Sequence, residues 1–203
     1  MPFAGRAFLV PNGVFKPRKV SLPLVDLGLE AIADKPGPRV VEVGTGSGAI
    51  ALTIAAERPD SKVYGIDVSH RAIAWARLNR RRLGIDNVRF LHGSLLEPLP
   101  ASAAARVSLV VANIPFIPPK DGPALAGVGP MSTITGPGAD GLAFVRDLAT
   151  QAMHALEPGG RLMLQLADWQ WRVLQEELDA FGYRFIDHRP GVPAFGVAEW
   201  NPD

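Results

Sequence analysis

The stretch "EVGTGSG", residues 42–48, stands between a short apolar run at 39–44 and a helical pattern at 48–58. Gly44, Gly46 and Gly48 let the backbone pass close to a flat, uncharged ligand and make a positive φ available at the turn. The spacing is not the G-x-G-x-x-G of a pyrophosphate binder, and no Gly-Lys-Ser/Thr of a phosphate-binding P-loop follows. We therefore expect a ligand-binding turn between a strand and a helix; a tight turn without a ligand is the alternative.

Around this turn, apolar runs alternate with helical patterns of about 10–15 residues. Strands are expected at 39–44, 62–67, 88–93, 107–112 and 161–166, with two more at 183–189 and 196–200. Helices are expected at 22–33, at 48–58, after Ser69 as far as 83, from 140 or 141 to a turn at 157–160, and from 168 to 181. This alternation predicts a doubly wound α/β fold with a mainly parallel, seven-stranded sheet. The last two strands would form an antiparallel C-terminal hairpin at its edge.

Composition bounds the class of protein. The 203 residues suit a single domain, residues 1–203, and a net charge of +1 counts against a dedicated nucleic-acid binder. Cysteine is absent, which excludes disulfides, thiolate metal sites and cysteine nucleophiles. The four histidines are scattered without an i, i+4 pair, so we expect no metal site. Neither a secretory signal nor an apolar stretch of about 20 residues is present, so a cytoplasmic location is expected.

Asp67 ends the second expected strand, 23 residues after Gly44. Open α/β sheets bind ligands beyond the carboxyl ends of their strands, and an acid at this place can accept both hydroxyls of a ribose. The alternative is that Asp67 caps the helix that follows, since "DVSHRA" offers a cap. Together with the glycine turn, ribose binding is the favoured interpretation.

Several segments resemble a known family. "EVGTGSGAIAL", "GIDVS", "NVRFLHGSLLEPL", "NIPFIP" and "LEPGGRLMLQL" occur in the order of the class I S-adenosylmethionine-dependent methyltransferases. The chain resembles in particular the HemK/PrmC group, which methylates a glutamine side-chain amide in translation release factors, and "GVFKPR" at 13–18 is similar to a segment of that group. The resemblance covers roughly residues 13–200. It implies a Rossmann-like methyltransferase fold, with S-adenosyl-L-methionine as the methyl donor and S-adenosyl-L-homocysteine as the product.

The resemblance also implies which residues hold the cofactor. The acid and glycines of the first motif line its methionine end, and Asp67 matches the ribose-binding acid. Ser94 stands where the family has an Asp that bonds the adenine amino group; its hydroxyl can accept that bond with a shorter reach, and Leu95 contributes a backbone N–H. The cofactor-binding residues implied are Glu42, Gly44, Thr45, Gly46, Gly48, Asp67, Val68, Ser94, Leu95 and Asn113.

The family pattern Asn-Pro-Pro-Tyr corresponds here to Asn113, Ile114, Pro115 and Phe116, the implied catalytic residues. An amide or aromatic-amine nitrogen is a poor nucleophile, so it has to be fixed in line with the sulfonium while acceptors hold its hydrogens. Asn113 Oδ1 and the Ile114 carbonyl can take one hydrogen each, and Pro115 keeps residue 114 extended. Phe116 offers a flat face to a planar substrate and to the cationic donor. The alternative is that Asn113 caps a turn and catalysis has been lost.

Residues 117–140 contain ten Gly or Pro among 24 residues and show no periodicity. A loop of this length inside a compact domain is either functional or disordered. We expect an active-site loop that orders on substrate binding; an idle linker is the alternative. Residues 1–36 are expected to form a segment on the substrate side. The helical N-terminal domain that bacterial members of the group use to dock the release factor is expected to be absent.

Three acceptors are compatible with the sequence. The resemblance favours a protein amide nitrogen. A small molecule or peptide-derived metabolite is the second hypothesis, and the amino group of a nucleic-acid base is the third. The near-neutral charge counts against nucleic acid, and we expect no membrane partner. A non-enzymatic cofactor-binding module is a more distant hypothesis, and the sequence leaves the oligomeric state and the need for a partner subunit open.

Overall fold

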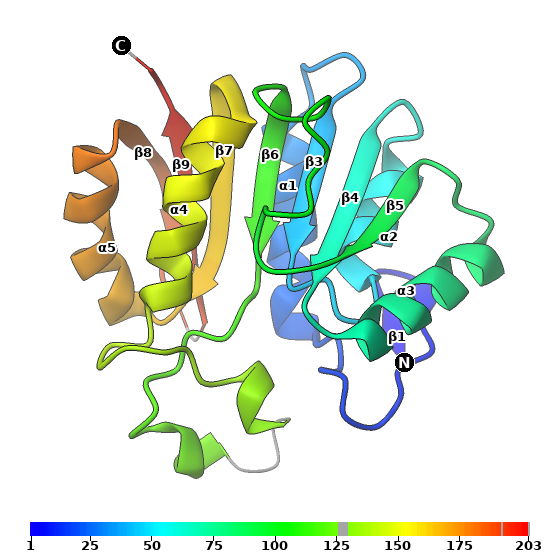
Figure 1. Ribbon diagram of the computed structural model, residues 1–203, viewed down its shortest axis with the longest axis horizontal. Helices are drawn as coiled ribbons and strands as arrows, with labels where there is room; N and C mark the ends of the chain where they lie inside the picture. The colour runs from blue at the N-terminus through cyan, green and yellow to red at the C-terminus, as the bar shows by residue number, and fades with distance from the viewer. Residues whose placement is uncertain (126–129, 192, 203) are drawn as a thin grey trace.

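The computed structural model describes residues 1–125, 130–191 and 193–202. A seven-stranded sheet runs in the order β5-β4-β3-β6-β7-β9-β8, in which β5, β4, β3, β6 and β7 are parallel (Figure 1). Strand β9 is antiparallel to both of its neighbours. Its strands are β3 (Arg39–Val43), β4 (Lys62–Asp67), β5 (Val88–His92), β6 (Val107–Ala112), β7 (Leu156–Leu166), β8 (Tyr183–Arg189) and β9 (Ala194–Trp200). The predicted doubly wound sheet with a C-terminal hairpin is confirmed.

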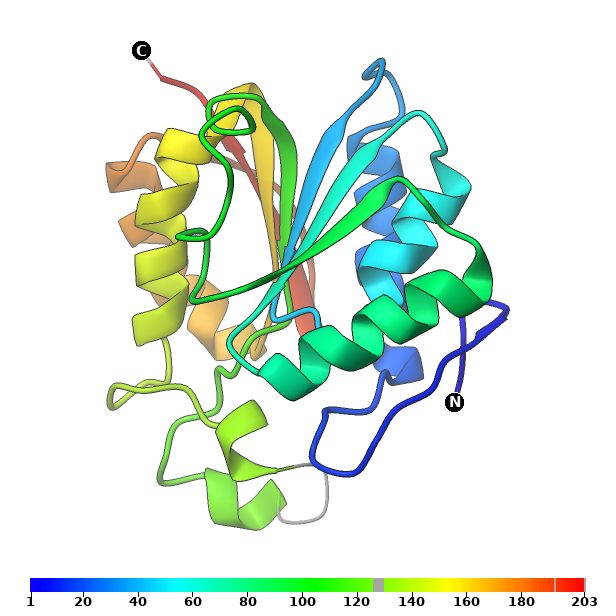
Figure 2. The same cartoon turned by 45° about the vertical axis from the view of Figure 1, so that its right-hand side comes forward.

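In the described part of the chain, five α-helices cover the two faces of the sheet (Figure 2). They are α1 (Leu22–Ala31), α2 (Ala49–Glu57), α3 (His70–Leu83), α4 (Ala143–Ala155) and α5 (Asp168–Ala180). Helices α1, α2 and α3 share one apolar core, and α4 and α5 share the other. A small hairpin of β1 (Pro2–Phe3) and β2 (Arg6–Ala7) precedes them. Among the described residues, no helix has the length and apolar character needed to cross a membrane.

Local signals explain most of the boundaries. Ser69 Oγ accepts a hydrogen bond from the backbone N–H of Ala72 at 3.2 Å, so it caps α3 as expected. Gly84 ends the same helix with a φ of +66°. Helix α4 begins at Ala143 and not at 140 or 141, because Gly141 has a φ of +78° that a right-handed helix does not accommodate.

Strand β7 differs from the prediction. It begins at Leu156, so residues 157–160 are part of the strand and not a turn that precedes it. The pairing with β6 passes from Val107–Leu156 to Leu109–Arg161, so the chain bulges between these pairs. Gly159 supplies the positive φ of +71° that this bulge uses. The Pro-Gly-Gly sequence that suggests a turn thus serves a bulge inside a longer strand.

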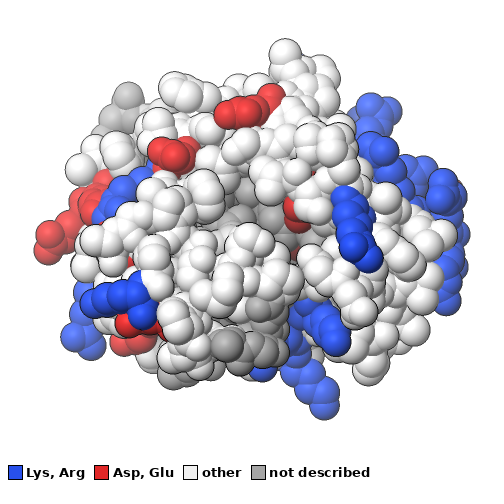
Figure 3. Space-filling view, turned by 60° about the horizontal axis from the view of Figure 1, so that its bottom comes forward, with Lys and Arg blue, Asp and Glu red and all other residues white. Residues whose placement is uncertain are grey.

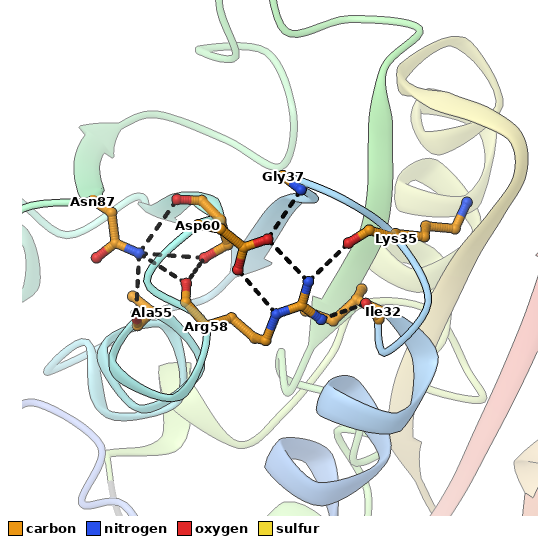
Figure 4. A network of polar contacts seen from close by, with 8 residues as sticks. Ile32, Lys35, Gly37, Ala55, Arg58, Asp60 and Asn87 are labelled. Atoms are coloured by element: carbon orange, nitrogen blue, oxygen red, sulfur yellow. Dashed lines mark hydrogen bonds and ion pairs between the residues drawn. The ribbon is translucent and has the colours of Figure 1, made fainter.

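One polar network fixes the loops at the amino ends of the central strands (Figure 4). The Arg58 guanidinium donates to the carbonyl of Ile32, to that of Lys35 at 2.8 Å and to the Asp60 carboxylate at 3.0 Å. Asn87 donates to the Arg58 carbonyl at 3.1 Å. The hydrogen bond from Arg58 holds the pKa of Asp60 at about 2, below its usual range. Side-chain hydrogen bonds therefore hold the loops at this end of the sheet.

Candidate functional site

A cavity of about 350 Å³ lies at the carboxyl ends of the parallel strands, where such sheets bind ligands. Figure 3 looks onto this end of the molecule, where mostly uncharged residues surround a central hollow with acidic atoms at its edge. Most of the predicted site residues line the cavity. They are Glu42, Gly44, Thr45, Gly46, Asp67, Val68, Ser94, Leu95, Asn113, Ile114 and Pro115. Of the predicted residues, Gly48 and Phe116 are not part of its lining.

The glycine turn has the backbone geometry that its sequence predicts. Gly44, Gly46 and Gly48 have φ angles of +73°, +55° and +81°. A Cβ atom added at Gly44 would lie 2.9 Å from Cγ2 of Ile114, so the turn and the Asn113 motif are in direct contact. Gly48 has a packing role, since a Cβ there would lie 2.8 Å from Cζ of Phe90. The turn therefore needs Gly44 at the cavity and Gly48 behind it.

Glu42 is buried at the start of this turn. Its Oε2 accepts hydrogen bonds from Thr45 Oγ1 at 2.5 Å and from the backbone N–H of Ala51 at 2.9 Å. Burial raises the pKa of Glu42 to about 8, although these two hydrogen bonds act in the opposite direction. Glu42 thus joins the turn to the first residues of α2, and it is mostly protonated at neutral pH.

We expect Glu42→Gln to remove a pH dependence from the stability of the protein. Between the ordinary pKa of 4.5 and the raised pKa of about 8, the folded protein holds one proton more than the unfolded chain. The free energy of unfolding therefore falls as the pH rises through this window, by up to about 1.4 kcal/mol per pH unit. The stabilisation is fully present below about pH 4.5 and is lost above about pH 8.

Urea unfolding of both proteins across this window measures the effect. A smaller slope in the Gln variant is the expected result, and parallel slopes would contradict the assignment. Gln can still accept the bonds from Thr45 and Ala51 through its amide oxygen, so we expect the variant to fold.

Asp67 connects the end of β4 to the glycine turn. Its Oδ2 accepts from the backbone N–H of Gly46 at 2.8 Å, and its Oδ1 accepts from that of Ser69 at 2.9 Å. Ser69, and not Asp67, caps α3 with its side chain. Each carboxylate oxygen retains a further lone pair, and the side chain lines the cavity, so both oxygens can also receive hydroxyl hydrogens.

Ser94 and Leu95 follow β5, an edge strand of the sheet, whereas Asn113 follows β6, and all three residues line the cavity. Leu95 has a φ of +46°, which is uncommon for a residue with a side chain. The next residue, Leu96, donates its N–H to Gln151 Oε1 at 2.8 Å, which fixes this strained turn from α4. Among the described residues, no acceptor receives the N–H of Leu95. Strain of this kind concentrates where a ligand is held.

The Asn113 motif presents two hydrogen-bond acceptors beside the cavity. Asn113 Nδ2 donates to Ser21 Oγ at 3.2 Å, while no described residue donates to Asn113 Oδ1. The Ile114 carbonyl likewise receives no hydrogen bond from the described residues. The Ile114 side chain is only 7% exposed and packs in the core. Acceptors on two consecutive residues suit a planar NH2 group, because each can take one of its two hydrogens.

Phe116 lies differently from what its place in the motif implies. Its side chain is partly buried against the apolar core beneath α4 and α5 and is not part of the cavity lining. Its backbone N–H donates to the Ile134 carbonyl at 3.2 Å. The aromatic side chain that does line the cavity near α4 is Phe144, which is 39% exposed. No sequence signal distinguishes Phe144 from the other residues of its helix.

Both ends of the loop at 117–140 are held by one side chain. Gln170 Nε2, at the start of α5, donates to the carbonyls of Phe116 at 2.7 Å and of Asp140 at 2.8 Å. Inside these contacts Ile117 pairs with Thr135. Short 3-10 helices form at Gly122–Leu125 and Met131–Thr133, and Ser132 and Thr133 line the cavity. Residues 126–129 of the predicted loop lie outside the described residues.

The N-terminal segment forms one wall of the cavity. Its lining residues include Val14, Phe15, Pro17 and Ser21. The buried Asn79 side chain, on α3, holds this segment, since it accepts from the N–H of Leu9 at 2.8 Å and donates to the Leu9 carbonyl at 2.9 Å. It also donates to the carbonyl of Ser47 at 3.0 Å. Residues 22–31 of the expected N-terminal segment form α1, which packs on the sheet.

Comparison with known proteins agrees with this geometry. A family model described as a methyltransferase domain matches residues 34–184. The release factor glutamine methyltransferase of Gloeobacter violaceus is 37% identical over 162 residues, which cover 77% of this chain and 55% of that protein. The release factor glutamine methyltransferase of Deinococcus radiodurans is 36% identical over 172 residues, which cover 83% of this chain and 59% of that protein. The chain thus spans little more than half of the length of these two relatives.

A third relative is matched over more of its length. The release factor glutamine methyltransferase of Burkholderia pseudomallei is 34% identical over 196 residues, which cover 92% of this chain and 67% of that protein. Among solved structures, ribosomal protein L11 methylase from Lactobacillus delbrueckii subsp. bulgaricus has a TM-score of 0.69 at 20% identity, covering 95% and 84% of the chains. The catalytic domain of hMettl16 in complex with an RNA hairpin has a TM-score of 0.77 at 16% identity, covering 97% and 75%.

At these identities the solved structures concern the fold alone, and they share its Rossmann-like methyltransferase sheet. The family model and the relatives concern the sequence itself, and they confirm the resemblance that the motifs indicated. The chain therefore belongs to the methyltransferase domain family, and its relatives within that family are the release factor glutamine methyltransferases, the HemK/PrmC group.

Proposed function

We propose that the protein is an S-adenosylmethionine-dependent N-methyltransferase that acts on a planar amide nitrogen, with a glutamine side chain of a protein as the acceptor. The observation that carries the proposal is that Asn113 Oδ1 and the Ile114 carbonyl accept no hydrogen bond from any described residue, while both residues line the same cavity as the glycine turn. The named activity of the relatives supports the choice of a protein amide.

The residues of the cavity fit the cofactor. Asp67 offers both carboxylate oxygens to the ribose, and Ser94 Oγ with the N–H of Leu95 offers an acceptor and a donor to the adenine edge. Gly44 and Gly46 allow the backbone to approach the methionine portion. When bound, S-adenosylmethionine supplies an electrophilic methyl group on a sulfonium.

The chain's own contribution to the reaction is positioning. Asn113 Oδ1 and the Ile114 carbonyl each hold one hydrogen of the acceptor NH2, which fixes the nitrogen and directs its lone pair toward the methyl group. With the donor bound, the carbon–nitrogen bond would form as the carbon–sulfur bond breaks, and one nitrogen proton would pass to solvent. Ser132 and Thr133 extend this wall of the cavity, so the loop at 117–140 is placed to contact the acceptor.

Two measurements test the proposal in sequence. Calorimetry with S-adenosylmethionine and S-adenosylhomocysteine tests the cofactor, and we expect both to bind; no heat of binding at millimolar ligand would exclude it. Incubation of the protein with a methyl-labelled donor and a bacterial extract, followed by fractionation by size and chemistry, then identifies the acceptor. Label on a protein glutamine is the expected result. Label on a metabolite or on nucleic acid would assign the acceptor to the corresponding alternative class.

A further inference from the structure

Ser21 stands at the start of α1, in the N-cap position, and is only 3% exposed. A serine there ordinarily accepts a hydrogen bond from the backbone N–H of the second or third helical residue. Its side chain makes no such bond here, and the second helical residue is Pro23, which has no N–H. Ser21 Oγ instead accepts from Asn113 Nδ2 at 3.2 Å, across 92 residues of sequence.

This contact restrains the Asn113 carboxamide, because the Ser21 hydroxyl accepts from Nδ2 in the orientation that the structure has. When Asn113 Oδ1 faces an acceptor NH2, the Nδ2 group points away from it and needs a partner of its own. Ser21, which is buried, supplies that partner, and Asn113 itself is partly buried. Without the hydroxyl, the productive orientation leaves a donor without a hydrogen bond, which is costly when the group is buried. The rotated carboxamide would then turn its NH2 toward the acceptor NH2, so that two donors face each other.

We propose that Ser21 is a positioning residue for methyl transfer, which holds the Asn113 carboxamide with its oxygen toward the acceptor nitrogen. Ser21 reaches no reacting atom in this proposal and acts through Asn113 alone. The proposal rests on the proposed function, because it takes the acceptor to be an NH2 group that needs Asn113 Oδ1. Ser21 belongs neither to the glycine turn nor to the Asn113 motif, so no sequence motif indicates this role.

A matched pair of variants tests the proposal. Ser21→Thr keeps the hydroxyl, while Ser21→Val has almost the same shape as Thr but replaces the hydroxyl with a methyl group. With a purified bacterial release factor and S-adenosylmethionine, we expect the Thr variant to retain kcat within about threefold of the parent. The Val variant should lose about tenfold relative to Thr, equivalent to about 1.4 kcal/mol. The KM for the release factor should differ by less than about twofold between the two variants. Their affinities for S-adenosylmethionine, measured by calorimetry, should also differ by less than about twofold.

Equal kcat values in the Thr and Val variants would overturn the proposal. A parallel loss of cofactor affinity in the Val variant would also overturn it, because that result indicates a general disturbance of the cavity. If the Val variant does not fold, Ser21→Ala replaces it, since the smaller side chain removes the hydroxyl without added bulk.

A second readout does not depend on turnover. The side-chain amide protons of Asn113, assigned in a 15N spectrum by their absence from Asn113→Asp, should exchange with water several times faster in Ser21→Val than in Ser21→Thr. Equal exchange rates would overturn the proposal even if the kinetics agreed with it. If the parent protein transfers no methyl group to the release factor, the proposed acceptor fails, while the exchange rates still decide whether Ser21 holds Asn113.

Discussion

Asn113→Ala is expected to reduce methyl transfer by at least about a hundredfold while cofactor affinity stays within about threefold. The substitution removes the oxygen that holds one hydrogen of the acceptor nitrogen, and loss of a single preorganised polar contact of this kind has a cost of that order. The backbone of the motif stays in place, because the Ile114 side chain remains packed in the core and in contact with the glycine turn. Transfer of a labelled methyl group measures the first quantity, and calorimetry with S-adenosylhomocysteine measures the second.

A second asparagine provides the control. Asn87 lies at the opposite end of the sheet, where its Nδ2 donates to backbone carbonyls that include those of Ala55 at 3.0 Å and Arg58 at 3.1 Å. We expect Asn87→Ala to lower the melting temperature and to leave kcat unchanged for the folded protein. Turnover of Asn113→Ala within a few-fold of the parent would contradict the role of Asn113 and would revive the interpretation of this residue as a simple turn.

Gly44→Ala is expected to weaken cofactor binding by about a hundredfold. Two physical effects combine at this position. The φ of +73° disfavours any side chain, and the new Cβ would lie 2.9 Å from Cγ2 of Ile114. Because the Ile114 side chain is packed in the core, the turn has to shift to relieve this contact. Calorimetry with S-adenosylmethionine measures the loss, with unfolding curves to show that the variant is folded.

The chain offers a matched glycine for comparison. Gly84 has a similar φ of +66° but no atom within 4 Å of the Cβ that a substitution would add, and it lies outside the cavity lining. Gly84→Ala should therefore reduce stability by about 1 kcal/mol without a change in affinity. The double variant Gly44→Ala/Ile114→Ala removes the crowding atom and should recover part of the affinity. Equal affinities for Gly44→Ala and the parent would contradict a cofactor site at this turn.

The fold could be predicted from the sequence because its signals are local. Apolar runs bounded by glycine and helical spacing repeat along the chain, and a parallel sheet then follows from their alternation. The Ser69 cap and the Gly84 end of α3 are signals of the same kind. The predicted start of β7 was wrong because Pro-Gly-Gly occurs both in turns and in bulges. Only the pairing with the neighbouring strand distinguishes the two.

Some residues of the candidate site could be placed from the sequence, and others could not. Residues at strand ends, such as Asp67 and Asn113, meet at one edge of the sheet, so their place in the sequence predicts their place in space. Ser21, Asn79 and Gln170 act through contacts with residues far away in the chain, and no local pattern reveals such contacts. Phe116 shows the reverse case, since its place in a motif does not say which way its ring points.

Gln170 joins the two ends of the loop at 117–140 at one place in the fold, the start of α5. The Phe116 and Asp140 carbonyls both accept hydrogen bonds from Gln170 at the start of α5. Under the proposed function, this anchor separates the loop residues that would contact the acceptor from Asn113 and Ile114, which would hold its nitrogen. Chimaeras that keep these two hydrogen bonds and exchange the residues between them would show whether the loop selects the acceptor.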